Sequence, residues 1–207
     1  MTKRIYLLLL ACVSLASCTP IMKMMYGIKD PDIENEKSIK KTALKCDMDT
    51  SNIATVAISG YLSALKGRGI PDCNIYDRNG KYIEYRQTDT SCNAGLFEFI
   101  PALRIDGKYS QPDTASMAEE LSGYRDLRGN ALPDLGAADY YVFIYWAVWA
   151  GKLNKDHVKI WEDLAKANTN CKIKVLKVNM DMQESWNADD RDRLVNALSK
   201  KPKGQYD

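Results

Sequence analysis

Cysteines are the residues of this chain with the most evident chemistry, and there are six of them. Four of these, Cys46, Cys73, Cys92 and Cys171, lie in the body of the chain, where they can form disulfides or act as thiol nucleophiles. No two of the four are spaced as Cys-x-x-Cys, and their spacing does not distinguish the three complete pairings. These scattered cysteines and the single histidine, His157, lack the ligand spacing of a zinc site. We therefore expect no metal and no cofactor.

The chain begins with the pattern of an export signal. A short basic region precedes an apolar segment (5–13) that is too short to span a bilayer. Residues 15–18, Leu-Ala-Ser-Cys, resemble the lipobox of bacterial lipoproteins. The resemblance implies a signal peptide over residues 1–17 and acylation, with palmitate or a similar chain, at Cys18. A plain secretory signal followed by a chance cysteine is the alternative.

Charge and hydropathy limit the partners. Without Lys3 and Arg4 of the signal, 27 Lys and Arg balance 27 Asp and Glu, so no basic excess favours nucleic acid. No later apolar segment is long enough to cross a bilayer, so attachment depends on the lipid. We expect localisation in the cell envelope, at the outer membrane of a Gram-negative bacterium, and an envelope protein as an unidentified partner.

The segment before the folded domain, residues 18–35, is polar. We predict that it is a tether. An arm that docks on the domain is the alternative, because the segment includes several apolar residues. These are Ile21, Met24, Met25 and Tyr26. We place the folded domain at residues 36–207, with an internal boundary near the turn-rich segment 128–139.

The first half of the domain mixes helices and strands. The pattern predicts a helix at 36–46, a strand at 52–59, a short helix at 61–67, a hairpin at 70–87 and helices at 91–103 and 113–127. Asn79-Gly80 supplies the positive φ angles of a tight hairpin turn. Ser91 is a suitable N-cap for the helix that follows the hairpin.

The sequence pattern of the second half of the domain predicts a parallel strand–helix–strand–helix unit. The segment 140–147, "YYVFIYWA", is apolar throughout, which is typical of a strand buried on both faces. A helix capped by Asn154 and a β-branched strand at 172–181 follow. Asn187 caps the last predicted helix.

The segment 140–181 resembles the central part of a thioredoxin-like domain. In that family an apolar strand ends in Trp-Ala-x-Trp, a Cys-Gly-Pro-Cys helix follows, and the next strand ends in Val-Asn-x-Asp. The residues 145–149 ("YWAVW"), Gly151 and 178–181 ("VNMD") match this pattern. The resemblance covers about 40 residues and implies a three-layer α/β sandwich with a mixed sheet.

The departures from the family pattern fall on its redox site. Ala150 and Leu153 stand where the family has cysteines, and Gly151 and Lys152 lie between them. Ile144 stands where the family has a buried acid. Thiol–disulfide exchange needs a thiolate, which neither Ala150 nor Leu153 provides. We therefore expect the frame of a redox site without its chemistry, with Ala150 at the start of the helix.

The segment 70–87 resembles the final hairpin of extracytoplasmic thioredoxin-like domains, in which a cis-proline opens a strand. In the family this hairpin follows the redox unit, whereas here it precedes it. The resemblance implies a cis Ile70–Pro71 bond, with Pro71 beside Ala150, in a thioredoxin fold of rearranged chain order. Two separate α/β lobes are the alternative. Cys73 and Cys92 flank the hairpin and are the candidate pair for a structural disulfide.

The sequence favours a role in binding or scaffolding over an enzymatic one. We expect a membrane-anchored lipoprotein with a redox-inactive thioredoxin-like domain and no catalytic residue. The alternative is a thiol–disulfide oxidoreductase or peroxiredoxin-like enzyme that uses Cys73, Cys92 or Cys171. An exposed thiol of low pKa would favour this enzyme.

Overall fold

The computed structural model describes residues 23–66, 68–86, 93–114 and 116–199. Cys18, Ser91 and Cys92 lie outside these residues. The strands are β1 (Ile33–Glu34), β2 (Ile53–Val56), β3 (Asp72–Asp77), β4 (Tyr82–Ile83), β5 (Tyr124–Arg125), β6 (Tyr140–Trp146), β7 (Ile173–Asn179) and β8 (Met182–Gln183). The α-helices are α3 (Glu36–Lys45), α4 (Tyr61–Leu65), α5 (Leu96–Ala102), α6 (Met117–Ser122), α7 (Ile160–Ala167) and α8 (Ala188–Ser199).

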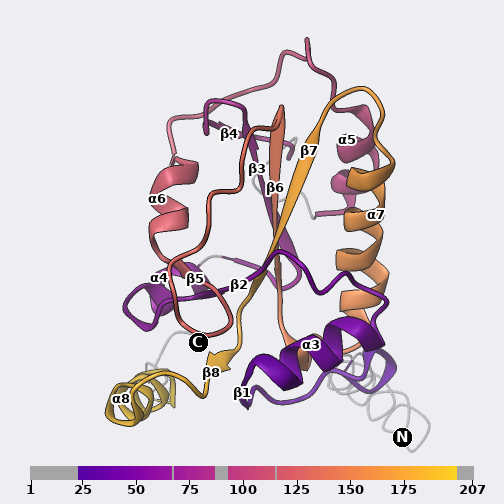
Figure 1. Cartoon of the computed structure of the whole chain (residues 1–207). Helices are drawn as coiled ribbons and strands as arrows, with labels where there is room; N and C mark the ends of the chain where they lie inside the picture. Colours follow the sequence, from indigo (N-terminus) through magenta and orange to yellow (C-terminus); the bar gives the residue numbers. More distant parts are fainter. Residues whose placement is uncertain (1–22, 67, 87–92, 115, 200–207) are drawn as a thin grey trace, which may run out of the picture.

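Six strands form one mixed sheet in the order β4-β3-β6-β7-β2-β5 (Figure 1). β3 is antiparallel to β6, and Asp72 pairs with Tyr145. β6 is parallel to β7, which is parallel to β2. The predicted hairpin therefore joins the C-terminal strands at one side of a single mixed sheet, and the alternative of two separate lobes is wrong. β1 and β8 form a separate parallel pair.

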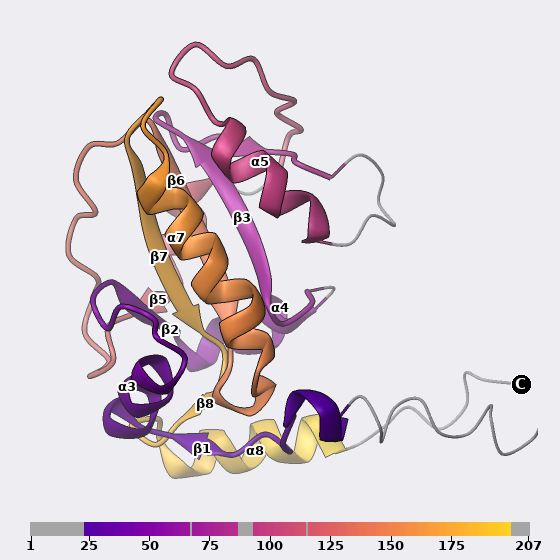
Figure 2. The same ribbon diagram turned by 90° about the vertical axis from the view of Figure 1, so that its right-hand side faces the viewer.

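Helices cover both faces of the sheet, which gives an α/β arrangement of three layers (Figures 1 and 2). On one face, Val142, Ile144 and Trp146 of β6 pack in a core that includes residues of α3, α5 and α7. On the other face, Phe143 and Tyr145 pack in a core that includes residues of α4 and α8. Every residue of β6 is buried, which confirms the prediction from its uninterrupted apolar sequence.

The β3–β4 hairpin forms where its sequence predicts it. The backbone N–H groups of Asn79 and Lys81 both donate to Oδ1 of Asp77, at 2.9 Å each. Gly80 has a φ of +75°, a conformation that glycine adopts without strain. The hairpin is thus closed by its own turn residues and presents β3 to β6.

Two helices are shorter than their sequences predict. α5 begins at Leu96, after a 3₁₀ turn (Asn93–Gly95), and it includes Pro101. α6 ends at Ser122, because Tyr124 turns its ring into the core and starts β5. The last helix, in contrast, begins as expected, and Oδ1 of Asn187 accepts from the N–H of Asp189 at 2.9 Å.

Candidate functional site

The ends of β6 and β7 carry the positions that the resemblance assigns to a redox site. β6 ends at Trp146 and leads into a 3₁₀ turn (Val148–Ala150). The carbonyl of Trp146 accepts from the N–H of Met180 at 2.8 Å, which joins this turn to the chain after β7. The side-chain amide of Asn154 donates to the carbonyl of Ala147 at 2.8 Å. These bonds fix the loop 148–153, which we call the degenerate loop.

The degenerate loop differs from a helix N-terminus. Gly151 has a φ of +60° and a ψ of −130°, so it interrupts the helical path after Ala150. Helical structure resumes at Leu153 and continues as a π-helix (Asn154–Lys159) into α7. The expectation that Ala150 starts the helix is therefore wrong. The expectation that Asn154 caps the helix is also wrong, because its side chain is bonded to the end of β6 instead.

An N-terminal segment, residues 23–29, lies on the degenerate loop. The N–H of Lys152 donates to the carbonyl of Tyr26 at 2.7 Å, and the N–H of Lys29 donates to the carbonyl of Trp149 at 2.9 Å. A Cβ atom added to Gly151 would lie 2.3 Å from the Tyr26 oxygen. Only glycine permits so close an approach of two backbones. The described part of the segment 18–35 thus contacts the domain, as in the docked-arm alternative.

The docked segment is held by its backbone rather than by its largest apolar side chains. Met24 and Met25 are 79% and 56% exposed, whereas Tyr26 is half-buried. Farther along, Ile33 and Glu34 pair with Met182 and Gln183. The segment therefore lies against Gly151 but leaves two methionines in solvent.

Asp181 lies buried beneath the degenerate loop. It is 2% exposed, and its Oδ2 accepts from the N–H of Val148 and from the side chain of Asn179, both at 2.7 Å. Its Oδ1 has no hydrogen-bond partner among the described residues. Burial raises the pKa of Asp181 to about 7. The two hydrogen bonds favour the charged form and lower the pKa, but the effect of burial is larger. Asp181 holds the turn after β6 in place.

Pro71 lies where the strand register requires it. The Ile70–Pro71 bond is cis, as the hairpin resemblance implies. Because Asp72 pairs with Tyr145, Pro71 stands beside the end of β6, next to the turn that leads to Ala150. Pro71 is buried, and its carbonyl accepts from the side chain of Asn93. The hairpin and the degenerate loop therefore meet at one end of the sheet.

The described cysteines are not activated thiols. Cys46, Cys73 and Cys171 are free, and Cys73 is fully buried. Burial raises the pKa of all three thiols. Cys73 is a free thiol, so it does not form the candidate disulfide with Cys92. Cys92 itself lies outside the described residues. No cysteine that the structure describes has the lowered pKa of an activated thiol.

A partly buried polar network joins α6 to the sheet, and nothing in the sequence pattern predicted it. The carboxylate of Glu120 accepts from the hydroxyl groups of Tyr124 and Tyr145 and from the side-chain amide of Asn74. The guanidinium of Arg68 lies 3.4 Å from the centroid of the Tyr145 ring. Burial raises the pKa of Tyr145 well above its usual range, so its hydroxyl group stays protonated. The network stabilises the attachment of α6, and its Arg68 and Glu120 side chains are still partly accessible to solvent.

A second buried polar contact lies on β7. The Lys177 ammonium donates to Oε1 of Glu162 on α7 at 2.8 Å, and both side chains are at most 2% exposed. Ile144, where the family has a buried acid, is the direct neighbour of Lys177 in the sheet. The carboxylate that balances Lys177 therefore comes from a helix instead of from β6. Lys177 shares a sheet face with Ile173 and Val175. A lysine in this apolar pattern was the sequence signal that could have predicted a buried ion pair.

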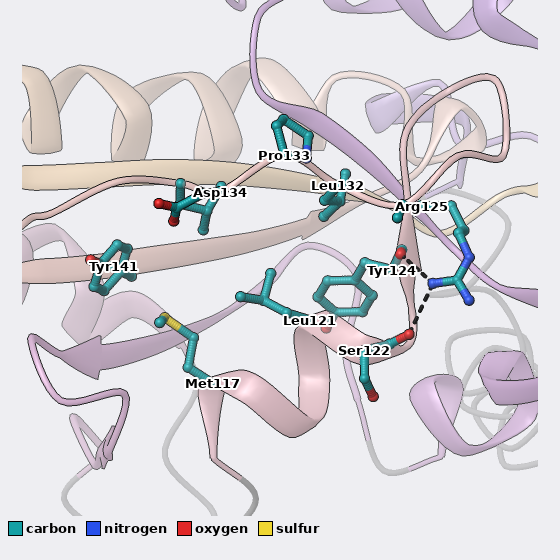
Figure 3. A pocket seen from close by; sticks show the side chains of 11 residues that line it. Met117, Leu121, Ser122, Tyr124, Arg125, Leu132, Pro133, Asp134 and Tyr141 are labelled. Carbon is teal, nitrogen blue, oxygen red and sulfur yellow. Dashed lines mark hydrogen bonds between the residues drawn. The ribbon is translucent and has the colours of Figure 1, made fainter.

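A pocket of about 290 Å³ lies between α6 and the segment 131–135 (Figure 3). Its lining is mainly apolar, and Figure 3 shows Leu121 and Leu132 directed into it. At the rim, Nη1 of Arg125 donates to the carbonyls of Ser122 and Tyr124, at 2.9 and 2.7 Å. The pocket has room for a small apolar group. Its residues are Met117, Leu121, Ser122, Tyr124, Arg125, Ala131, Leu132, Pro133, Asp134, Leu135 and Tyr141.

The described residues form neither a metal-binding cluster nor a membrane-spanning helix. No group of three or more His, Cys, Asp or Glu side chains in the described residues is placed to hold a metal ion. His157 packs its ring against Phe97 and Trp161. None of the described helices is long and apolar enough to cross a membrane. Comparison with protein-family models, curated proteins and solved structures finds no match.

Proposed function

We propose that this chain is an envelope lipoprotein whose thioredoxin-like domain is redox-inactive and acts in binding or scaffolding. The observation that carries the proposal is the covered degenerate loop. Its two cysteine positions are Ala150 and Leu153, and the backbone of Tyr26 lies on Gly151 between them. A substrate disulfide would find neither a sulfur atom nor free surface at Ala150, which is fully buried.

The sheet supports the thioredoxin-like part of the proposal. The order β4-β3-β6-β7-β2, with β3 antiparallel to β6, is the order expected when the hairpin and closing helix precede the strand–helix–strand unit. α5 follows the hairpin as a closing helix would, and α7 packs on the same face. The bond before Pro71 is cis and precedes β3, which pairs antiparallel with the end of β6, and both features support the hairpin resemblance.

Purified protein should leave substrate disulfides intact. In an insulin precipitation assay with dithiothreitol, we expect the rate of the uncatalysed control, because Cys46 and Cys73 are buried, Cys171 is half-buried, and the pKa of each of these thiols is raised. Titration of all thiols with a disulfide reagent from pH 6 to 9 extends the test to Cys92. A thiol with an apparent pKa well below 8, or insulin reduction above background, would support the alternative enzyme instead.

The anchor is tested by lipid labelling. Cys18→Ser should abolish incorporation of labelled palmitate and release the protein from the membrane fraction, because Cys18 is the proposed acylation site. Cys12→Ser is the matched control, since Leu-Leu-Ala-Cys at 9–12 also fits the lipobox. Labelling that persists in Cys18→Ser and disappears in Cys12→Ser would move the anchor to Cys12. One acyl chain binds a bilayer only marginally, so a stable anchor needs more than one.

A further inference from the structure

The end of the domain that carries residues 23–29 exposes apolar side chains. Met24 and Met25 are adjacent and largely in solvent, on a helical turn whose backbone is fixed to Trp149 and Lys152. Figure 2 shows this turn, in the darkest indigo, at the opposite end of the molecule from the segment between α5 and α6. The exposed methionines therefore lie on a turn that backbone hydrogen bonds hold against the domain.

The distance from this surface to the proposed acylation site is short. Four residues, 19–22, separate Cys18 from Lys23. An extended chain covers at most about 3.6 Å per residue, so the five steps reach about 18 Å. This step rests on the proposed lipid anchor. If Cys18 is acylated, the docked segment cannot lie far from the bilayer while it stays bound to the degenerate loop.

We propose that this end of the domain lies against the bilayer, with Met24 and Met25 in the interfacial region. The degenerate loop then faces the membrane, beneath its own N-terminal segment. The occupant of this surface is a phospholipid bilayer, because the anchored chain leads directly to it. A second domain-sized partner would have to fit within the roughly 18 Å that the tether spans.

Charge contributes little to this contact, because Lys152 is the one basic residue of the docked segment and the degenerate loop beyond those that acidic residues of the segment balance. In residues 23–32, Lys23 and Lys29 are balanced by Asp30 and Asp32, and Lys23 pairs with Asp30 at 3.4 Å. Attraction to anionic headgroups requires an excess of basic residues near the surface. The contact therefore depends mainly on the acyl chains and the two methionines, and it should be nearly the same on neutral and anionic bilayers.

Photo-crosslinking of the full acylated protein tests the orientation. Benzoylphenylalanine replaces Met25, Lys152 or Ile105, one at a time, in protein reconstituted into phosphatidylcholine vesicles that contain a tritium-labelled phospholipid. Ile105 is the matched control, because it is 58% exposed, close to the value of Met25, and lies in the segment between α5 and α6. Lys152 is exposed and belongs to the folded loop, so it separates contact by the domain from contact by the tether.

We expect lipid crosslinks to be at least fivefold more frequent from Met25 and Lys152 than from Ile105, with little change when a third of the lipid is anionic. Equal yields at all three positions, in protein that carries the acyl label, would overturn the orientation and leave the anchor intact. Crosslinks from Met25 alone would also overturn it, because the domain would then be free of the bilayer. Crosslinks from Lys152 to a second protein chain would assign the surface to a protein instead. Absence of the acyl label would overturn the anchor itself and this inference with it.

Discussion

Two buried carboxylates near β7 are held in different ways. Glu162 faces the Lys177 ammonium at 2.8 Å and also accepts from the N–H of Asp49 at 3.1 Å. Asp181 accepts only from uncharged donors, and one of its oxygens has no partner among the described residues. The first carboxylate faces a cation, which offsets part of its desolvation cost, whereas burial raises the pKa of the second. The first is a fixed charge pair, and the second can lose its charge near neutral pH.

The largest expected effect comes from breaking the charge pair. Lys177→Met should lower the free energy of unfolding by about 3–5 kcal/mol, because it leaves Glu162 buried without its main cation. Lys166→Met is the matched control. Lys166 lies 3.3 Å from the same Glu162 oxygen but is 53% exposed, so we expect a loss below about 1 kcal/mol. Urea unfolding at pH 7.5 measures both, and equal losses would show that burial does not set the strength of this pair.

Asp181 should make stability depend on pH in the direction opposite to that of a salt-bridged carboxylate. Its pKa is about 7 in the folded protein and about 3.9 in an unfolded chain. The folded state therefore binds the proton more tightly than the unfolded state does. The resulting contribution of Asp181 to the free energy of unfolding is complete below about pH 4 and is lost as the pH rises to about 7. A shift of this size corresponds to at most about 4 kcal/mol.

Asp181→Asn should remove this part of the pH dependence. The amide keeps an oxygen that accepts from Val148, but it cannot ionise. Unfolding free energies at pH 5, 6, 7 and 8 should therefore decline less steeply in the variant than in the parent protein. Identical slopes would mean that Asp181 is ionised throughout this range.

A smaller effect is expected where the N-terminal segment meets the degenerate loop. Gly151→Ala should displace residues 26–27, because the new Cβ would lie 2.3 Å from the Tyr26 oxygen, and it should cost upward of about 1 kcal/mol. Gly129→Ala is the control, since Gly129 also has a positive φ but has no atom within 4 Å of an added Cβ. Hydrogen exchange at Lys29 and Lys152 should accelerate in Gly151→Ala only. Unchanged exchange there would show that the segment adapts without leaving the loop.

Local patterns predicted the sheet better than they predicted the site. The uninterrupted apolar segment at 140–147 and the Asn79-Gly80 turn specify β6 and the hairpin by themselves, so these elements could be read directly. The conformation of Gly151 could not be predicted from the local sequence, because Gly151 lies against Tyr26, which is more than a hundred residues earlier in the chain. Glu120 was likewise an ordinary position on a predicted helix. Its importance comes from Tyr145 and Asn74, which reach it only after the sheet has formed.

The strand order also determines when the protein can fold during synthesis. β2 and β3 are not neighbours, because β6 and β7 lie between them in the sheet. A nascent chain that ends before Tyr140 therefore holds the flanking strands but lacks the two central ones that join them. Contacts between residues so distant in sequence close slowly. Until the last third of the chain has been made, the two central strands are missing and no complete sheet can form.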